Sequence, residues 1–363
     1  MKHLSAVHKY FWKYRVRLFA GIVFVIASNY FGVLAPEITG FVVNKVQEQL
    51  PGGKTLNASH HYNTAVLWFV NQVSGFDYGK LLLICSITIL ILALLRGTFM
   101  FIMRQTLVVM SRYIEYDMKN AVYNHYQQLD ASFFKQNRTG DLMNRIAEDV
   151  SRVRMYTGPA VMYFVNLVSL IVLCLFNMFN KDAYLTWIVI APLPILAITI
   201  YFVNTIIHKK SERVQSSLSD MTTNAQESYS GIRVIKSFVQ EKAMLLFFKK
   251  NSERYRNNAV GLAKVEAIYF PSMTLLIGLS TLLTIYTGSK MALDDPQKLG
   301  IIAEFVIYIN MLMFPVTAIG SVASMVQRAA ASQKRLNEFM QTEPAIQSPE
   351  NVKSNVPVSG DIA

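Results

Sequence analysis

The sequence predicts an all-α membrane protein with six transmembrane helices and long helical extensions outside the bilayer. First, 52% of the 363 residues are hydrophobic and only 16% are charged, and the mean hydropathy is +0.30. Soluble domains carry roughly 25% charged residues. Second, six segments are apolar over the length that a bilayer requires, about 20 residues. Third, Lys and Arg residues collect on one side of these segments.

Four of the six apolar segments contain proline inside the predicted helix. A proline within a span kinks the helix, and neighbouring helices satisfy the carbonyl groups that the kink frees. An even number of crossings returns the chain to the side on which it began. The predicted spans are residues 18–46, a segment that begins near Lys80, and residues 161–179, 185–207, 267–293 and 299–326.

The basic residues alternate between rich and poor stretches along the chain. Four stretches hold 27 Lys and Arg residues and the polar stretches between them hold three: the rich ones are 1–17, 111–154, 208–264 and 328–363, and the poor ones are 47–77, 180–183 and 292–299. Loops rich in Lys and Arg resist translocation, so we expect both termini in the cytoplasm, in a bacterial plasma membrane. The net charge of +12 therefore reflects the membrane topology of the chain, since the basic residues lie on its cytoplasmic side. Without basic clusters that carry aromatic platforms, no nucleic-acid partner is expected.

Residues 1–17 lack the short apolar core and the cleavage site of a signal peptide. Their aromatic and basic side chains predict an interfacial helix on the cytoplasmic membrane surface.

Cys85 and Cys174 each lie in an apolar run, so they are expected to be small core residues rather than a disulfide or zinc ligands. His60 and His61 point to opposite sides of an extended chain and have no third ligand nearby, so no metal site is predicted.

Two long hairpins are predicted on the cytoplasmic side. Residues 104–129 contain helix formers without glycine or proline, and at about 1.5 Å per residue this helix extends roughly 37 Å past the membrane. Asp141 is predicted to cap the returning helix. The second hairpin descends to Gly231 and returns from about Val239. Helical spacing predicts two buried stripes: Leu142, Ile146, Val150 and Val153 in the first hairpin, and Val214, Leu218, Met221 and Ala225 in the second.

The tips of these hairpins resemble the transmembrane domain of ABC exporters of the multidrug and lipid type. The first tip carries Ser132-Phe133-Phe134 and then Thr139-Gly140-Asp141-Leu142-Met143. The second carries Glu227 and then residues 231–238, GIRVIKSF. Residues 304–316 and 323–340 also resemble the family, in the same order. The resemblance covers essentially the whole chain and implies the exporter fold with a domain-swapped dimer, either homodimeric or heterodimeric.

The resemblance implies that each tip is a coupling helix docked on a nucleotide-binding domain, which would bind ATP and Mg. Closure of those domains would then alternate the access of a cavity between the two sides of the membrane. The coupling residues implied in the first tip are Phe133, Phe134, Lys135, Gln136, Asn137, Arg138, Thr139 and Gly140. Those in the second tip are Ser230, Gly231, Ile232, Arg233, Val234, Ile235, Lys236 and Ser237.

The domain organisation that follows is an interfacial (elbow) helix over 1–17, a six-helix transmembrane domain over 18–340 and a linker over 341–363. No GxxxxGK[ST] phosphate loop occurs. Gly53-Lys54-Thr55 matches the end of this motif, but the motif's first glycine would be at position 48, which is Glu48. The chain therefore has no predicted catalytic residues, and an ATPase domain is expected either in a continuation of the chain or in a separate one.

Charged and polar residues inside apolar spans are candidates for a substrate cavity, because an intramembrane charge costs about 2.5–3.5 kcal/mol on insertion scales. The candidates are Glu37, Glu304, Phe305 and Asn310. Two other functional classes remain open. A self-contained six-span channel or ion-coupled transporter would move ions without ATP, although no TVGYG-like filter is present. A non-transporting dimeric sensor would bind partners without moving a substrate.

Overall fold

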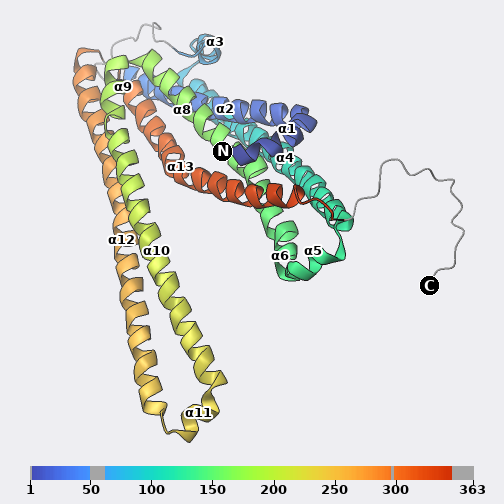
Figure 1. Cartoon of the computed structure of the whole chain (residues 1–363). Helices are drawn as coiled ribbons and strands as arrows, with labels where there is room; N and C mark the ends of the chain where they lie inside the picture. Colours follow the sequence, from blue (N-terminus) through green and yellow to red (C-terminus); the bar gives the residue numbers. More distant parts are fainter. Residues whose placement is uncertain (1, 50–61, 296–297, 346–363) are drawn as a thin grey trace, which may run out of the picture. The chain divides into compact units, whose positions relative to one another are not determined.

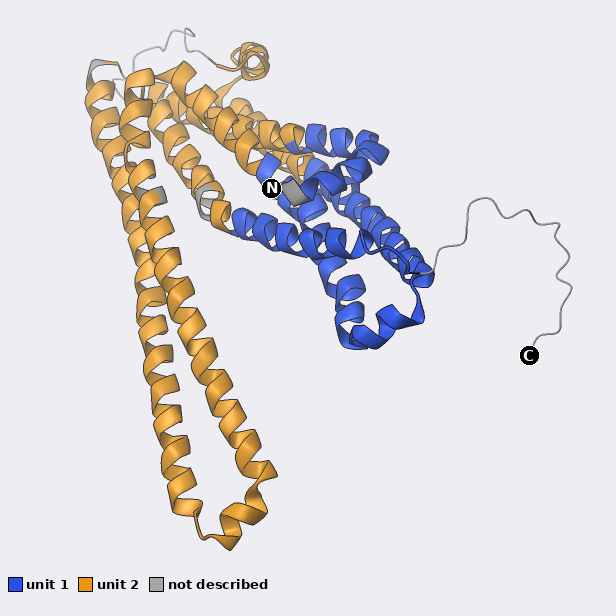
Figure 2. Ribbon diagram, in the orientation of Figure 1, with its two compact units in different colours: residues 1–25, 98–165, 321–363 blue, residues 26–97, 166–320 orange. Residues whose placement is uncertain are grey.

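The computed structural model describes residues 2–49, 62–295 and 298–345, and within these ranges it contains helices and short connections but no strand (Figure 1). The chain forms two compact units (Figure 2). Unit 1 comprises residues 1–25, 98–165 and 321–363, and unit 2 comprises residues 26–97 and 166–320. The described helices are η1 (Lys2–Val7), α1 (His8–Lys13), α2 (Arg15–Glu48), α3 (Thr64–Val73), α4 (Tyr78–Gln128), α5 (Ala131–Gln136), α6 (Thr139–Asn144), η2 (Arg145–Asp149), α7 (Val150–Met155), η3 (Tyr156–Ala160), α8 (Val161–Lys181), α9 (Ala183–Ile190), α10 (Pro192–Ser230), α11 (Ile232–Ser237), α12 (Glu241–Asp294) and α13 (Lys298–Met340).

Five stretches of helix in the described part of the chain are long and apolar enough to cross a membrane: Arg15–Glu48, Tyr78–Gln128, Thr139–Lys181, Glu241–Leu293 and Lys298–Met340. They include five of the six predicted spans.

The remaining predicted span, residues 185–207, is divided into α9 and α10 at Ala191. Pro192 and Pro194 have no N–H to donate to the preceding turn, so the helical hydrogen-bond ladder is interrupted there. Six spans therefore stay a prediction.

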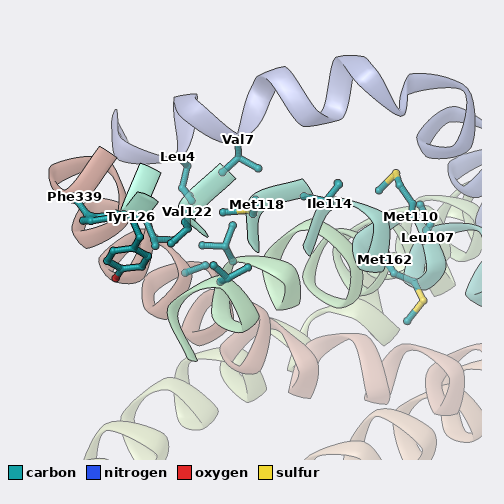
Figure 3. Close-up of a cluster of buried hydrophobic side chains, with 14 of the residues drawn as sticks. Leu4, Val7, Leu107, Met110, Ile114, Met118, Val122, Tyr126, Met162 and Phe339 are labelled. Atoms are coloured by element: carbon teal, nitrogen blue, oxygen red, sulfur yellow. The ribbon is translucent and has the colours of Figure 1, made fainter. Parts of the chain in front are cut away.

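Unit 1 is built around a stripe on the second half of α4 (Figure 3). Leu107, Ile114 and Val122 recur at helical spacing and are almost fully buried. The returning helices pack on this stripe. The predicted burial is confirmed for Leu142, Val150 and Val153, whereas Ile146 is partly buried. The prediction that Asp141 caps this segment is wrong. The helix begins at Thr139, so Asp141 lies inside its first turn, where its negative charge still faces the positive end of the helix.

The N-terminal segment also belongs to the core of unit 1. Leu4 and Val7, on the 3₁₀ helix η1, are buried in it. The segment that was expected to be one interfacial helix is instead η1 followed by α1, with a break at Tyr14 before α2. Trp12 is exposed on this segment. The expectation that one side of the segment lies on the membrane surface stays a prediction.

Unit 2 contains a long hairpin in which α10 and α12 lie side by side and α11 forms the tip (Figure 1). Asn258 on α12 donates a hydrogen bond to Ser217 on α10 at 2.8 Å, which fixes their register. The returning helix begins at Glu241, two residues later than predicted. Cys85 and Cys174 are buried free thiols in this unit, as predicted.

Helix α3 is absent from the sequence-based predictions, which treated residues 47–78 as a polar loop. It is an amphipathic helix whose Val66, Val70 and Val73 pack into unit 2. Its start is marked by Asn63, whose side chain accepts a hydrogen bond from the Ala65 N–H. His60, His61 and Gly53-Lys54-Thr55 lie outside the described residues, as does most of the predicted linker.

Candidate functional site

The first hairpin tip, in unit 1, consists of α5, a two-residue connection and α6. Residues 135–140 were expected to form a single short helix. They are instead divided between the end of α5, the extended residues Asn137 and Arg138, and the start of α6. The Asn137 side chain donates to the Phe133 carbonyl at 2.9 Å, which closes the end of α5. The two parts of this tip are thus held in a defined bend.

Aromatic contacts anchor the first tip to the rest of unit 1. Phe133 is half-buried, and its ring centroid lies 6.1 Å from that of Phe339 near the end of α13. Tyr126, on α4, packs against Phe339 at 4.4 Å and donates a hydrogen bond to the Leu142 carbonyl at 3.0 Å. Three segments distant in the sequence therefore meet behind the tip, so the tip packs against both α4 and α13.

The outer surface of the first tip is exposed. Phe134 is 44% exposed although it is a large apolar residue directly beside the anchored Phe133. Met143 of α6 is a second exposed apolar residue of the tip, at 58%. The exposed residues between these two are polar or small and include Lys135, Gln136, Arg138, Thr139 and Gly140. Aromatic residues and methionine are enriched at protein–protein interfaces.

The second tip, in unit 2, is α11 with the turns on either side. Gly231 ends α10, and its N–H donates to the Glu227 carbonyl at 2.8 Å. After α11, Val239 has a φ of 53°, a left-handed conformation that β-branched residues rarely adopt. Lys236 and Glu241 form an ion pair at 3.0 Å across this turn. The predicted coupling segment, residues 230–237, therefore corresponds to α11 and its capping residues.

Apolar side chains cluster on the surface of the second tip. Val234 is 60% exposed and Phe238 is 71% exposed. A contiguous group of exposed apolar residues on a soluble surface usually marks an interaction site. The exposed apolar residues of this tip are Tyr229, Ile232, Val234, Phe238 and Val239.

The four residues expected to line a substrate cavity lie in unit 2 and have different environments. Phe305 is fully buried in the core, and Asn310 is exposed, with its side-chain amide donating to the Val306 carbonyl at 2.7 Å. Glu37 and Glu304 are both 1% exposed. They lie in one ion cluster with Lys181, a residue that sequence reasoning assigned to a polar connection. Only Asn310 has the exposure expected of a cavity residue.

Long apolar helices define a membrane-type protein, and two helical tips carry exposed apolar side chains. The family model for the ABC transporter transmembrane region matches residues 18–316. The chain therefore belongs to the ABC transporter transmembrane family.

Three relatives illustrate the range of the family. A probable multidrug resistance ABC transporter ATP-binding/permease protein, YheI of Bacillus subtilis, is 29% identical over 247 residues, covering 68% of this chain and 42% of the relative. The multidrug resistance-like ATP-binding protein MdlA of Escherichia coli is 24% identical over 351 residues, covering 95% of this chain and 54% of the relative. The ATP-dependent lipid A-core flippase of Vibrio vulnificus is 25% identical over 253 residues, covering 70% and 43%. This chain thus spans about half the length of these relatives.

Proposed function

We propose that this chain is the transmembrane half of an ATP-driven exporter for a hydrophobic or amphipathic substrate, such as a drug, a lipid or a peptide. It would work as a homodimer or heterodimer in a bacterial plasma membrane, with both termini in the cytoplasm. ATP and Mg would be bound by a nucleotide-binding domain, either a continuation of this chain or a separate one. Relatives named for multidrug resistance and for lipid A-core flipping support this substrate class.

The observation that carries the proposal is the exposed apolar surface at both tips. Phe134 and Val234 are large side chains left uncovered at the ends of hairpins that extend from the apolar helices. Burying one such side chain stabilises a contact by about 1.5–3 kcal/mol. Each residue is thus able to change the docking of a partner domain by roughly 10- to 150-fold.

The construction of the hairpins favours mechanical transmission. α10 and α12 run side by side from the apolar part of unit 2 to α11, so a displacement of α11 moves both helices as one lever. In unit 1 the tip is anchored through Phe133 and Phe339 to α13. Rigid-body motion of such elements between two packed arrangements is a common form of switching. ATP-driven closure of docked domains would move the levers and alternate the access to a substrate path.

The test is an uncoupling experiment in proteoliposomes that contain this chain and its ATPase domain. Val234→Asp and Phe134→Asp each place a charge on an exposed apolar position. Phe134 also has ring contacts with Phe133 and Tyr126, so thermal unfolding is measured alongside to show that its variant is folded. We expect ATP-dependent transport of a fluorescent hydrophobic dye to fall at least tenfold, because the tip no longer docks. Tyr116→Asp, an equally exposed apolar position on α4 away from the tips, is the control.

Retention of full ATP-coupled transport in both tip variants would overturn the proposal. Ion flux from the chain alone, without any ATPase, would support instead a self-contained channel or ion-coupled transporter.

A further inference from the structure

A buried cluster of three charges in unit 2 has no part in the proposed coupling. It brings together Glu37 of α2, Lys181 at the end of α8 and Glu304 of α13. The Lys181 Nζ lies 3.4 Å from Glu304 Oε2 and 4.0 Å from Glu37 Oε2. The three side chains are 1–2% exposed, so water does not screen their charges. The cluster joins three helices that are far apart in the sequence.

The hydrogen bonding of the cluster is incomplete. Glu37 Oε2 accepts a hydrogen bond from the Asn63 N–H at 3.0 Å, just before α3. In contrast, Glu304 Oε2 and Lys181 Nζ are buried without a hydrogen-bond partner among the described residues. The Lys181 ammonium also lies 4.1 Å from the centre of the Tyr62 ring, within the range of a cation–π contact. A buried carboxylate oxygen that lacks a donor indicates a missing ligand.

Among the described residues, Lys181 is the one cation that pairs with Glu37 or Glu304. Lys45 forms an ion pair with Glu48 at 2.7 Å on α2, and Lys298 pairs with Asp182 at 3.2 Å. Each of these lysines is therefore balanced by its own acid. Two further titratable groups face the cluster from neighbouring elements, and both are uncharged tyrosines: Tyr62 before α3 and Tyr308 on α13.

Two ionised carboxylates against one ammonium leave a net charge of −1 inside the protein. An unbalanced buried charge is strongly disfavoured, and two carboxylates that share a site respond by retaining a proton. A metal cation is a poor alternative, because the Lys181 ammonium already lies between the carboxylates and would repel it. A proton needs no cavity, and it also provides the O–H donor that ionised carboxylates lack.

We propose that the Glu37–Lys181–Glu304 cluster is a proton-binding site in which one proton is held by one or the other of the two carboxyl groups that flank the Lys181 ammonium. The proton belongs to the pair rather than to either residue, because strongly interacting groups titrate together. It neutralises the cluster and so favours the arrangement in which α2, α8 and α13 are held together. A motion that admits water to the cluster allows both carboxyl groups to ionise, and the proton is released. Acidic conditions therefore favour the arrangement in which α2, α8 and α13 exclude water from the cluster.

The test is infrared spectroscopy of the full chain in lipid nanodiscs, titrated with alkali from neutral pH. A protonated carboxyl group has a C=O band distinct from that of a carboxylate. We expect the wild type to lose one such band per chain on titration, and Glu37→Gln and Glu304→Gln each to lack that band at the start. Glu48→Gln, on the same helix as Glu37 but in a separate ion pair, should retain it. Lys181→Met should contain two protonated carboxyl groups, because both must then be neutral.

Either of two outcomes would overturn the proposal. One is a wild-type protein without a titrating carboxylic acid band, which would mean that both carboxyl groups are ionised. The other is persistence of the band in both glutamine variants, which would place the proton elsewhere. Glutamine has the shape of a protonated glutamate, so both variants must fold. Failure of both to fold would also contradict a bound proton.

Discussion

At the scale of single residues, one ion pair holds the end of α13 to the returning helices of unit 1. Asp149 is almost fully buried and forms a bidentate pair with Arg335, whose Nε lies 3.0 Å from Asp149 Oδ2. The Arg335 side chain is 47% exposed and also donates to Ser332. The ion pair therefore matters more to Asp149 than to Arg335. The carboxylate has little access to water, whereas the guanidinium retains part of its hydration.

This asymmetry predicts unequal effects of the two single substitutions. Arg335→Met leaves a buried carboxylate without its partner and should destabilise the protein by about 1–3 kcal/mol. Asp149→Asn keeps a hydrogen-bond acceptor beside a half-hydrated guanidinium and should cost less than about 1 kcal/mol. Thermal unfolding of both variants in the same detergent measures the difference. The double variant should recover part of the loss, and an equal loss in both single variants would show that the pair is not asymmetric.

At the scale of elements, helix α3 depends on its first residues. Asn63 combines three contacts: its side chain accepts from Ala65 and from the Tyr30 hydroxyl, and its backbone N–H donates to Glu37. The side-chain contacts are lost in alanine, whereas the backbone contact is retained. Asn63→Ala therefore separates the capping of α3 from its attachment to the buried charge cluster.

We expect Asn63→Ala to cost about 1 kcal/mol of local stability, the typical value for an N-cap. Amide hydrogen exchange over residues 64–73 should then accelerate roughly fivefold. Asn71→Ala, an exposed substitution on the same helix, is the control and should leave exchange unchanged. Unchanged exchange in Asn63→Ala would mean that packing of Val66 and Val70 alone holds the helix.

The sequence patterns were most informative for long elements. Periodic apolar residues predicted the stripe from Leu142 to Val153, because helical spacing and burial are local properties. α3 was not predicted because its ten residues follow a polar stretch that contains a Gly-Gly pair, and only Asn63 and three valines mark the helix. Pro192 predicted a kink, and the structure interrupts the helix there at Ala191 alone, which keeps a right-handed helical conformation.

The buried charge cluster was only partly predictable. Glu37 and Glu304 were noticeable because charges are rare in apolar spans. Lys181 was not, because it stands beside Asn180 and Asp182 and resembles a loop residue. Its burial arises from contacts with residues more than a hundred positions away, which a single sequence does not reveal. For the same reason, the sequence did not reveal that Glu37 and Glu304, which were expected to line a cavity, are buried.

At the scale of the whole molecule, the apolar helices and the two tips have separate roles. The helices provide the membrane-type body, and its family is shown by the match over residues 18–316. In the proposed function the tips provide the surface for a partner, and Phe134 and Val234 are exposed there. The proposed exporter function depends on both, because transport needs a path through the helices and a force at the tips.

The most direct test of whether the two tips dock on an ATPase domain is site-specific photo-crosslinking in membranes that contain this chain together with that domain. A photoreactive amino acid is introduced at Phe134 or Val234, and at Leu83, an exposed residue within an apolar helix, as the control. We expect both tip positions to crosslink to the nucleotide-binding domain, with yields that change on addition of ATP and Mg, and Leu83 to crosslink to lipid. Crosslinks from both tips to lipid alone, or yields that ignore ATP, would contradict the proposed coupling.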